Sequence, residues 1–166
     1  MAAVHGIHNV FDDNGYKDLL LLTLFGLRKL GREGDDAVDA QGRQFETKTV
    51  ARVSSRGVRK TTLSITTEHT MTLANIARYR QTFMWIVAIF DGAEPEAIWE
   101  IATDSLEPFF AQWEARLLEL DDYERPMRDH LNNPKIPLRF IAEHGVQVWP
   151  PQEADPGYAP PTTAAD

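Results

Sequence analysis

The stretch GDDAVDAQGRQFETKTV, residues 34–50, contains a short polar turn followed by a run in which apolar and polar side chains alternate. The alternation predicts a strand over residues 43–53, with Phe45 on one face of a sheet and Glu46 and Lys48 on the other. A three-residue loop at 40–42, with its glycine in the left-handed conformation, would join this strand to a preceding strand at 37–39. The stretch therefore predicts a β-hairpin.

The register of this hairpin has chemical consequences. It places Asp36 opposite Glu46, where paired Cβ atoms lie roughly 4.5 to 5.5 Å apart, so both carboxylates could share one hard divalent cation. Lys48 projects from the same face about 7 Å further along the strand. A cation that polarises a phosphate and an ammonium that orients water together suit the hydrolysis of a phosphodiester. The alternative is an exposed strand with routine opposite charges, because Glu-x-Lys triplets are common.

A basic segment follows the hairpin. Residues 49–67, TVARVSSRGVRKTTLSITT, contain four basic residues and no acidic one, within a chain whose formal net charge is -8. The many hydroxyl groups, together with Arg56, Arg59 and Lys60, suit contacts to phosphate oxygens of nucleic acid. A solvated basic loop is the alternative interpretation.

Two further sites carry side chains that are able to read bases. His69 lies just beyond the basic segment and could donate to a base edge, and Asn132 and Asn133 could form the bidentate contact that asparagine makes with adenine. Each has a simpler explanation, because a lone histidine is usually structural and Asn-Asn-Pro is a common turn.

The remaining hydrophobic patterns predict elements in the order helix, sheet, helix. The run TFMWIVAIF is nearly continuous in apolar residues, as expected of a central strand that is buried on both faces. The run EAIWEIA follows it after a turn at DGAEP. Helices are predicted at residues 16–30, 72–79, 104–120 and 137–144, and strands at 37–39, 43–53, 61–67, 82–90 and 146–149.

Length and composition limit the class of protein. The 166 residues fit one domain at 1–149, followed by a disordered acidic tail at 150–166 that carries five of the ten prolines. The absence of cysteine excludes disulfide frameworks, thiolate zinc sites and cysteine nucleophiles. The longest apolar run, 19–27, is about half of the ~20 residues that span a bilayer, and no secretory leader precedes it. We expect a cytoplasmic protein without a membrane span.

Taken together, these segments resemble the PvuII-type restriction endonucleases, a branch of the PD-(D/E)XK nucleases, from about His5 to Trp149. The resemblance rests on the motifs VFDDNG, GREGDDAVDAQGRQFETK, ANIARYRQ, EAIWEI, NNPKIP and EHG, which occur in the same order. It implies a restriction-endonuclease-like α/β core, in which helices flank a central mixed β-sheet. It also implies a homodimer that cleaves double-stranded DNA with Mg²⁺ at a short palindrome, beside a cognate methyltransferase that is not physically bound.

The resemblance also assigns roles to individual residues. Asp36 and Glu46 are similar to the metal-binding carboxylates of the family, and Lys48 to its catalytic lysine. Asp13 aligns with an aspartate at the DNA cleft that links recognition of the site centre to catalysis. Tyr79 aligns with a tyrosine near the metal site, where we expect it to contact DNA. The positions at which the family reads bases correspond to Thr66, His69, Asn132 and Asn133.

The chain departs from the family pattern at informative places. Glu68-His69-Thr70 stands where the family carries adjacent histidines, and a carboxylate that faces bases would prefer the amino group of cytosine. The segment between Lys48 and Thr66 is several residues longer than in the relatives. The family also has a helical segment upstream of the HGI motif at residues 5–7, so we expect either another dimer surface or a natural start further upstream.

These features favour a type II restriction endonuclease. A second hypothesis is a PD-(D/E)XK nuclease of DNA repair or processing with little sequence preference. A third is a DNA-binding protein that has lost cleavage, against which the intact set of Asp36, Glu46 and Lys48 argues.

Overall fold

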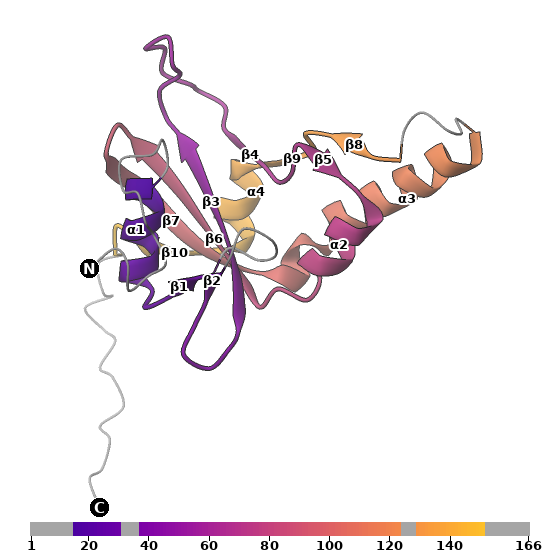
Figure 1. The fold of residues 1–166 in the computed structure, drawn as a ribbon. Helices are drawn as coiled ribbons and strands as arrows, with labels where there is room; N and C mark the ends of the chain where they lie inside the picture. Colours follow the sequence, from indigo (N-terminus) through magenta and orange to yellow (C-terminus); the bar gives the residue numbers. More distant parts are fainter. Residues whose placement is uncertain (1–14, 31–36, 124–128, 152–166) are drawn as a thin grey trace, which may run out of the picture.

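The computed structural model describes residues 15–30, 37–123 and 129–151 (Figure 1). The helices are α1 (Gly15–Leu24), α2 (Leu73–Tyr79), α3 (Glu107–Tyr123) and α4 (Leu138–His144), with a 3₁₀ turn, η2 (Thr103–Leu106), before α3. The central sheet contains β1 (Arg28–Lys29), β2 (Ala37–Val38), β3 (Gln44–Ala51), β6 (Met84–Asp91), β7 (Glu94–Ala102) and β10 (Val146–Trp149). Two short ribbons pair β4 (Ser64–Thr66) with β9 (Lys135–Pro137), and β5 (Thr70–Met71) with β8 (Leu131–Asn132).

The six-stranded sheet runs in the order β1-β2-β3-β6-β7-β10. It is mixed, because β3 and β6 are parallel while the other neighbours are antiparallel. Strand β6 is buried over six consecutive residues, which confirms the predicted central strand. Helix α1 covers one face of the sheet, and helices α2, α3 and α4 lie on the other (Figure 1). One apolar cluster lies between each face and the helices that cover it. The predicted α/β core is confirmed.

The hairpin between β2 and β3 has the predicted register over its described residues. Ala37 pairs with Phe45, and Gly42 adopts a left-handed φ of 81° in the loop. The Asp39 carboxylate accepts hydrogen bonds from the backbone N–H groups of Gln41 and Arg43, at 2.9 and 2.8 Å. An aspartate that bonds to its own turn in this way fixes the loop and hence the strand pairing.

Two predicted helix boundaries are wrong. The first helix ends at Leu24 rather than near residue 30, because Gly26 takes a left-handed φ of 64° and the Leu27 N–H bonds to the Leu22 carbonyl. This is the glycine stop of a Schellman motif, which lets Leu27 enter the core from outside the helix. The second wrong boundary is the start of α3, which was predicted at residue 104 but lies at Glu107, after η2. Pro108 still lies in the first turn of the helix, as expected.

Two sequence expectations fall on the ends of the chain. The tail predicted at residues 150–166 lies outside the described residues beyond Pro151. Among the described helices, none combines the length and apolar character needed to cross a bilayer.

A small hairpin at residues 52–60 extends beyond β3 at the top of Figure 1. Val53 and Arg59 form its bridge, and Gly57 occupies its turn with a φ of 76°. Ion pairs fix its base, because the Arg52 guanidinium bonds to Glu96, and Arg59 lies 2.5 Å from Asp91. The basic segment is thus partly neutralised by the acids beside it.

These ion pairs predict a pH dependence of the hairpin. The hydrogen bond from Arg52 lowers the pKa of Glu96 below its ordinary value of 4.5. A carboxyl whose folded pKa is depressed stabilises the structure above its unfolded pKa and loses that contribution as the pH falls through the folded value. We therefore expect amide protection at Ser54 and Lys60, corrected for intrinsic exchange, to fall below pH 4.5. Glu96→Gln should remove this pH dependence, and an unchanged profile in that variant would contradict the assignment.

Candidate functional site

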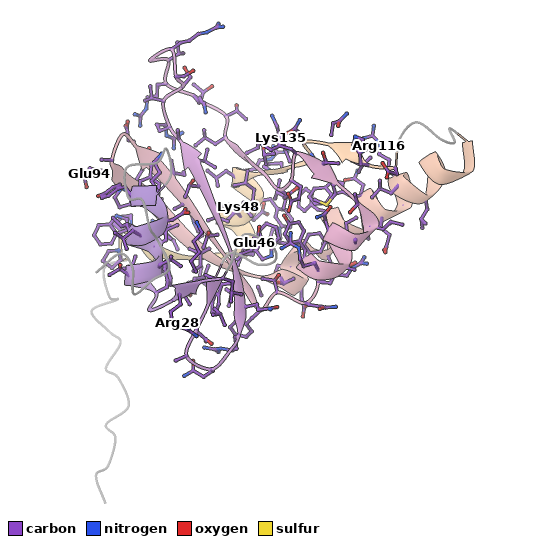
Figure 2. All side chains as sticks on the ribbon, viewed as in Figure 1. Arg28, Glu46, Lys48, Glu94, Arg116 and Lys135 are labelled. Carbon is purple, nitrogen blue, oxygen red and sulfur yellow. The ribbon has the colours of Figure 1, made fainter. Side chains whose placement is uncertain are left out.

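The site is centred on Glu46 and Lys48, two residues apart on β3. Strand β3 lies inside the sheet between β2 and β6, and Glu46 is only 2% exposed. The Lys48 Nζ lies 2.6 Å from the Glu46 Oε1, and Figure 2 shows both residues at the middle of the molecule. Burying a carboxylate is costly unless a cation compensates it. The alternative of an exposed, charge-laced strand is therefore wrong.

A second cation faces the other oxygen of Glu46. Arg78, in the last turn of α2, places its Nη1 3.7 Å from the Glu46 Oε2. Its Nη2 donates to the Glu68 Oε1 at 2.8 Å, so one guanidinium lies between two carboxylates. The helix that carries Arg78 begins with a capping box formed by Thr72 and Asn75.

Tyr79 forms the floor of this site. Its ring is fully buried and packs on Trp85 at a centroid distance of 4.7 Å, while its hydroxyl lies 2.9 Å from Glu68 and 3.0 Å from the Thr67 carbonyl. Burial, followed by the negative charges of Glu46 and Glu68, raises the pKa of Tyr79. The phenol is thus a neutral hydrogen-bond donor beside the carboxylates, and a direct contact with DNA would require it to become exposed.

The four predicted base-reading residues come together in one exposed patch. Strand pairing places Thr66 beside Lys135, and Asn132 beside Thr70. The His69 Nδ1 lies 2.8 Å from the Asn133 Oδ1, and the Asn133 N–H bonds to the His69 carbonyl. Because an amide oxygen only accepts, this contact assigns the proton to Nδ1 and leaves Nε2 and the Asn133 amino group for other partners. Residues some 60 positions apart thus form one polar surface.

Metal ligands were predicted at Asp36 and Glu46. Among the described residues, no group of three histidine, cysteine or acidic side chains is arranged as a metal site. Asp36 and Asp13 both lie outside the described residues. Glu46 supplies the hard oxygen ligands that Mg²⁺ prefers, and Lys48 and Arg78, which face its two oxygens, supply positive charge that a bound cation would partly replace. The donor chemistry at Glu46 therefore fits a divalent cation.

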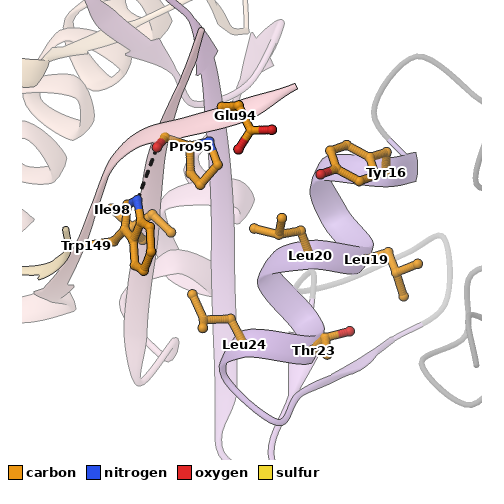
Figure 3. A pocket seen from close by; sticks show the side chains of 9 residues that line it. All are labelled: Tyr16, Leu19, Leu20, Thr23, Leu24, Glu94, Pro95, Ile98 and Trp149. Carbon is orange, nitrogen blue, oxygen red and sulfur yellow. Dashed lines mark hydrogen bonds between the residues drawn. The ribbon is translucent and has the colours of Figure 1, made fainter. Parts of the chain in front are cut away.

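An apolar pocket of about 500 Å³ lies away from these charges, between α1 and strands β7 and β10 (Figure 3). Leucine side chains of α1 form one wall, and Trp149 forms the other, with its Nε1 donating to the Pro95 carbonyl at 3.1 Å. The one carboxylate in its lining, Glu94, is the first residue of β7, and Figure 2 shows it well apart from Glu46. The pocket contributes no group to the candidate site.

Sequence reasoning missed two members of the site, Arg78 and the inward-facing Glu68. The motif ARYRQ contains Arg78 next to Tyr79. Because Tyr79 was expected near the metal site, its neighbour could have been predicted there as well. The contact of Glu68 with Arg78 joins residues ten apart, with β5 and most of α2 between them, which no local pattern indicates.

One comparison with known proteins bears on the whole site. The family model described as restriction endonuclease PvuII matches residues 1–149 of the chain. The match includes every residue of the candidate site, and also the segments at 1–14 and 31–36 that lie outside the described residues.

Proposed function

We propose, from the premise that this chain belongs to the PvuII restriction endonuclease family, that it hydrolyses both strands of double-stranded DNA with Mg²⁺ at a short palindrome. The observation that carries the proposal is the buried Glu46 carboxylate, paired with the partly buried Lys48 ammonium, in the interior of a mixed sheet. A charged pair held at this depth is costly, which makes it a candidate for chemistry.

The proposed metal ligands are Glu46 and Asp36. Ala37 pairs with Phe45 in the hairpin, and Asp36 and Glu46 are the next residues in sequence to these two partners. This neighbourhood supports the assignment of two carboxylates to one centre. When bound there, Mg²⁺ would polarise the scissile phosphate and lower the pKa of a water ligand.

Lys48 is the proposed catalytic lysine. Its ammonium group would orient the attacking water and stabilise the negative charge that develops on the pentavalent phosphate. The water oxygen bonds to phosphorus, one P–O ester bond breaks, the water gives up a proton, and the leaving oxygen takes one. The ion pair with Glu46 holds the Lys48 ammonium at this centre.

Sequence recognition is assigned to the polar patch of Thr66, His69, Asn132 and Asn133. Its groups are exposed, come from two adjacent ribbons and present both donors and acceptors, as reading base edges in the major groove requires. Asp13 is proposed to link this recognition to catalysis, and Tyr79 to support the centre from behind.

Phosphate contacts are assigned to the hairpin at 52–60. Arg56 and Lys60 are exposed on it, and Arg59 would have to leave Asp91 in order to bind a phosphate. A palindromic site has two-fold symmetry, so the proposed protein is a homodimer in which each subunit cuts one strand. A cognate methyltransferase is expected in the same system without a physical complex.

The proposal predicts the products of a plasmid digest. The purified chain with Mg²⁺ should convert a plasmid of known sequence into discrete fragments, and EDTA should abolish cleavage by removing the metal. Gel electrophoresis of the products provides the measurement.

Other outcomes of this digest identify the alternatives. A smear of products would support a low-specificity repair or processing nuclease, and binding of duplex DNA without any Mg²⁺-dependent nicking would support a cleavage-deficient DNA-binding protein. Either result would contradict the proposed restriction activity.

A further inference from the structure

We infer that Glu68 is a positioning residue of the catalytic centre, whose carboxylate holds the Arg78 guanidinium back from Glu46 and so keeps Glu46 available to a divalent cation. The inference rests on the proposed function for the metal. It assigns Glu68 to the centre rather than to the reading of bases.

The distances around Arg78 carry the first step. The guanidinium donates to Glu68 at 2.8 Å, a full charge-assisted hydrogen bond, whereas its Nη1 lies 3.7 Å from the Glu46 Oε2. The two contacts use different nitrogens, Nη2 and Nη1, so one planar group spans both carboxylates. Of these two carboxylates, Glu68 holds the guanidinium more closely.

The surroundings of Glu68 fix its direction. The same Oε1 that accepts from Arg78 also accepts from the Tyr79 hydroxyl at 2.9 Å, and Tyr79 is immobilised in the aromatic core. Glu68 therefore points towards the end of α2. The next residue, His69, belongs to the base-reading patch, and its ring is bonded to Asn133 instead.

Charge balance gives the consequence for the metal. Lys48 already bonds to one oxygen of Glu46, and a guanidinium bonded directly to the other oxygen would compete with any cation for that carboxylate. Pairing Arg78 with Glu68 lowers this competition, because the negative charge of Glu68 offsets most of the field that the guanidinium exerts on an incoming cation. The Arg78 Cζ lies 4.6 Å from the centroid of the Tyr79 ring, and this contact favours the same position of the guanidinium.

The position of Arg78 is tested first without metal or DNA. Glu68→Gln keeps the size and a hydrogen-bond acceptor but removes the charge. Crystal structures of the metal-free protein and of this variant should show the distance between Arg78 Nη1 and Glu46 Oε2 shortening from 3.7 Å to a direct hydrogen bond in the variant. A guanidinium that stays at its original distance, or turns to solvent, would overturn the inference.

The consequence for the metal is tested by titrating Mg²⁺ alone into the full chain, using calorimetry. Glu68→Gln should weaken Mg²⁺ binding by about three- to tenfold. Arg78→Ala should then strengthen binding more in the Glu68→Gln background than in the native one, because only there does Arg78 compete directly. An equal gain in both backgrounds would mean that the two charges act independently, and would contradict the inference.

Glu107→Gln is the matched control. Glu107 pairs with Arg80, two residues beyond Arg78, so the same chemical change is made to a neighbouring arginine outside the centre. Its Mg²⁺ affinity should equal that of the native chain. If Glu68→Gln instead altered the cleaved sequence at native Mg²⁺ affinity, Glu68 would be a base-reading residue. Failure of the native chain to bind Mg²⁺ would count against the proposed function, while the crystal structures would still decide the position of Arg78.

Discussion

Replacing Lys48 by alanine is expected to lower the rate of DNA cleavage by at least about 10²- to 10³-fold, which is typical for the loss of one group that stabilises transition-state charge. The Nζ is the ammonium at the proposed centre that bonds directly to the buried Glu46 carboxylate, at 2.6 Å. Its loss removes the group that orients the water, while the binding surface formed by the ribbons stays in place. Single-turnover cleavage with saturating enzyme measures this effect separately from DNA affinity.

Lys29→Ala provides a matched control for this prediction. Lys29 also pairs with an acid, Asp18, at 2.9 Å, but on the surface beside α1. It should cut at the native rate. Cleavage by Lys48→Ala at that same rate would contradict the assignment of the catalytic lysine.

Replacing Glu46 by glutamine is expected to abolish both cleavage and the stabilisation of the protein by Mg²⁺. Glutamine keeps the size of the side chain but loses the charge that binds a divalent cation. It also leaves Lys48 and Arg78 beside a neutral group, which costs at most about 3 kcal/mol of folding free energy, because both cations keep some contact with solvent. Denaturant unfolding with and without Mg²⁺ measures both effects, because a cation that binds the native state raises its stability.

The control for Glu46 is Glu94→Gln, which alters an exposed carboxylate at the rim of the α1 pocket. Mg²⁺ should stabilise this variant as much as the native chain. If Mg²⁺ stabilised the Glu46→Gln variant equally well, the metal would bind elsewhere and the proposed centre would be wrong.

Local patterns predicted most of the fold because each reflects a local physical preference. The turn chemistry of Asp39 and Gly42 set the register of the first hairpin, and the unbroken apolar run from Met84 to Phe90 indicated a strand buried on both faces. The α1 boundary failed because Leu27 continues the apolar pattern of the helix, although Gly26 ends the helix and turns the chain back to the core.

The site was predictable only in part because its members meet through tertiary structure. Spacing and the family resemblance identified Glu46 and Lys48 on one strand, and the structure adds that Glu46 is buried and bonded to the partly buried Lys48. The contact between His69 and Asn133, and the bridge that Arg78 makes to Glu68, depend on how ribbons and helices pack. Glu68, where the chain departs from the family pattern, bonds to Arg78 and Tyr79 in the structure, a contact that no local sequence pattern indicates.

The measurement that tests the central claim most directly is the sequencing of all DNA ends produced from a plasmid by the purified chain and Mg²⁺. It reports activity, recognition sequence and the relation between the two cuts in one experiment. We expect every end to fall within one short palindrome, with the two strands cut at positions related by its two-fold axis. Ends distributed over unrelated sequences, or cuts confined to one strand, would contradict a symmetric restriction endonuclease centred on Glu46 and Lys48.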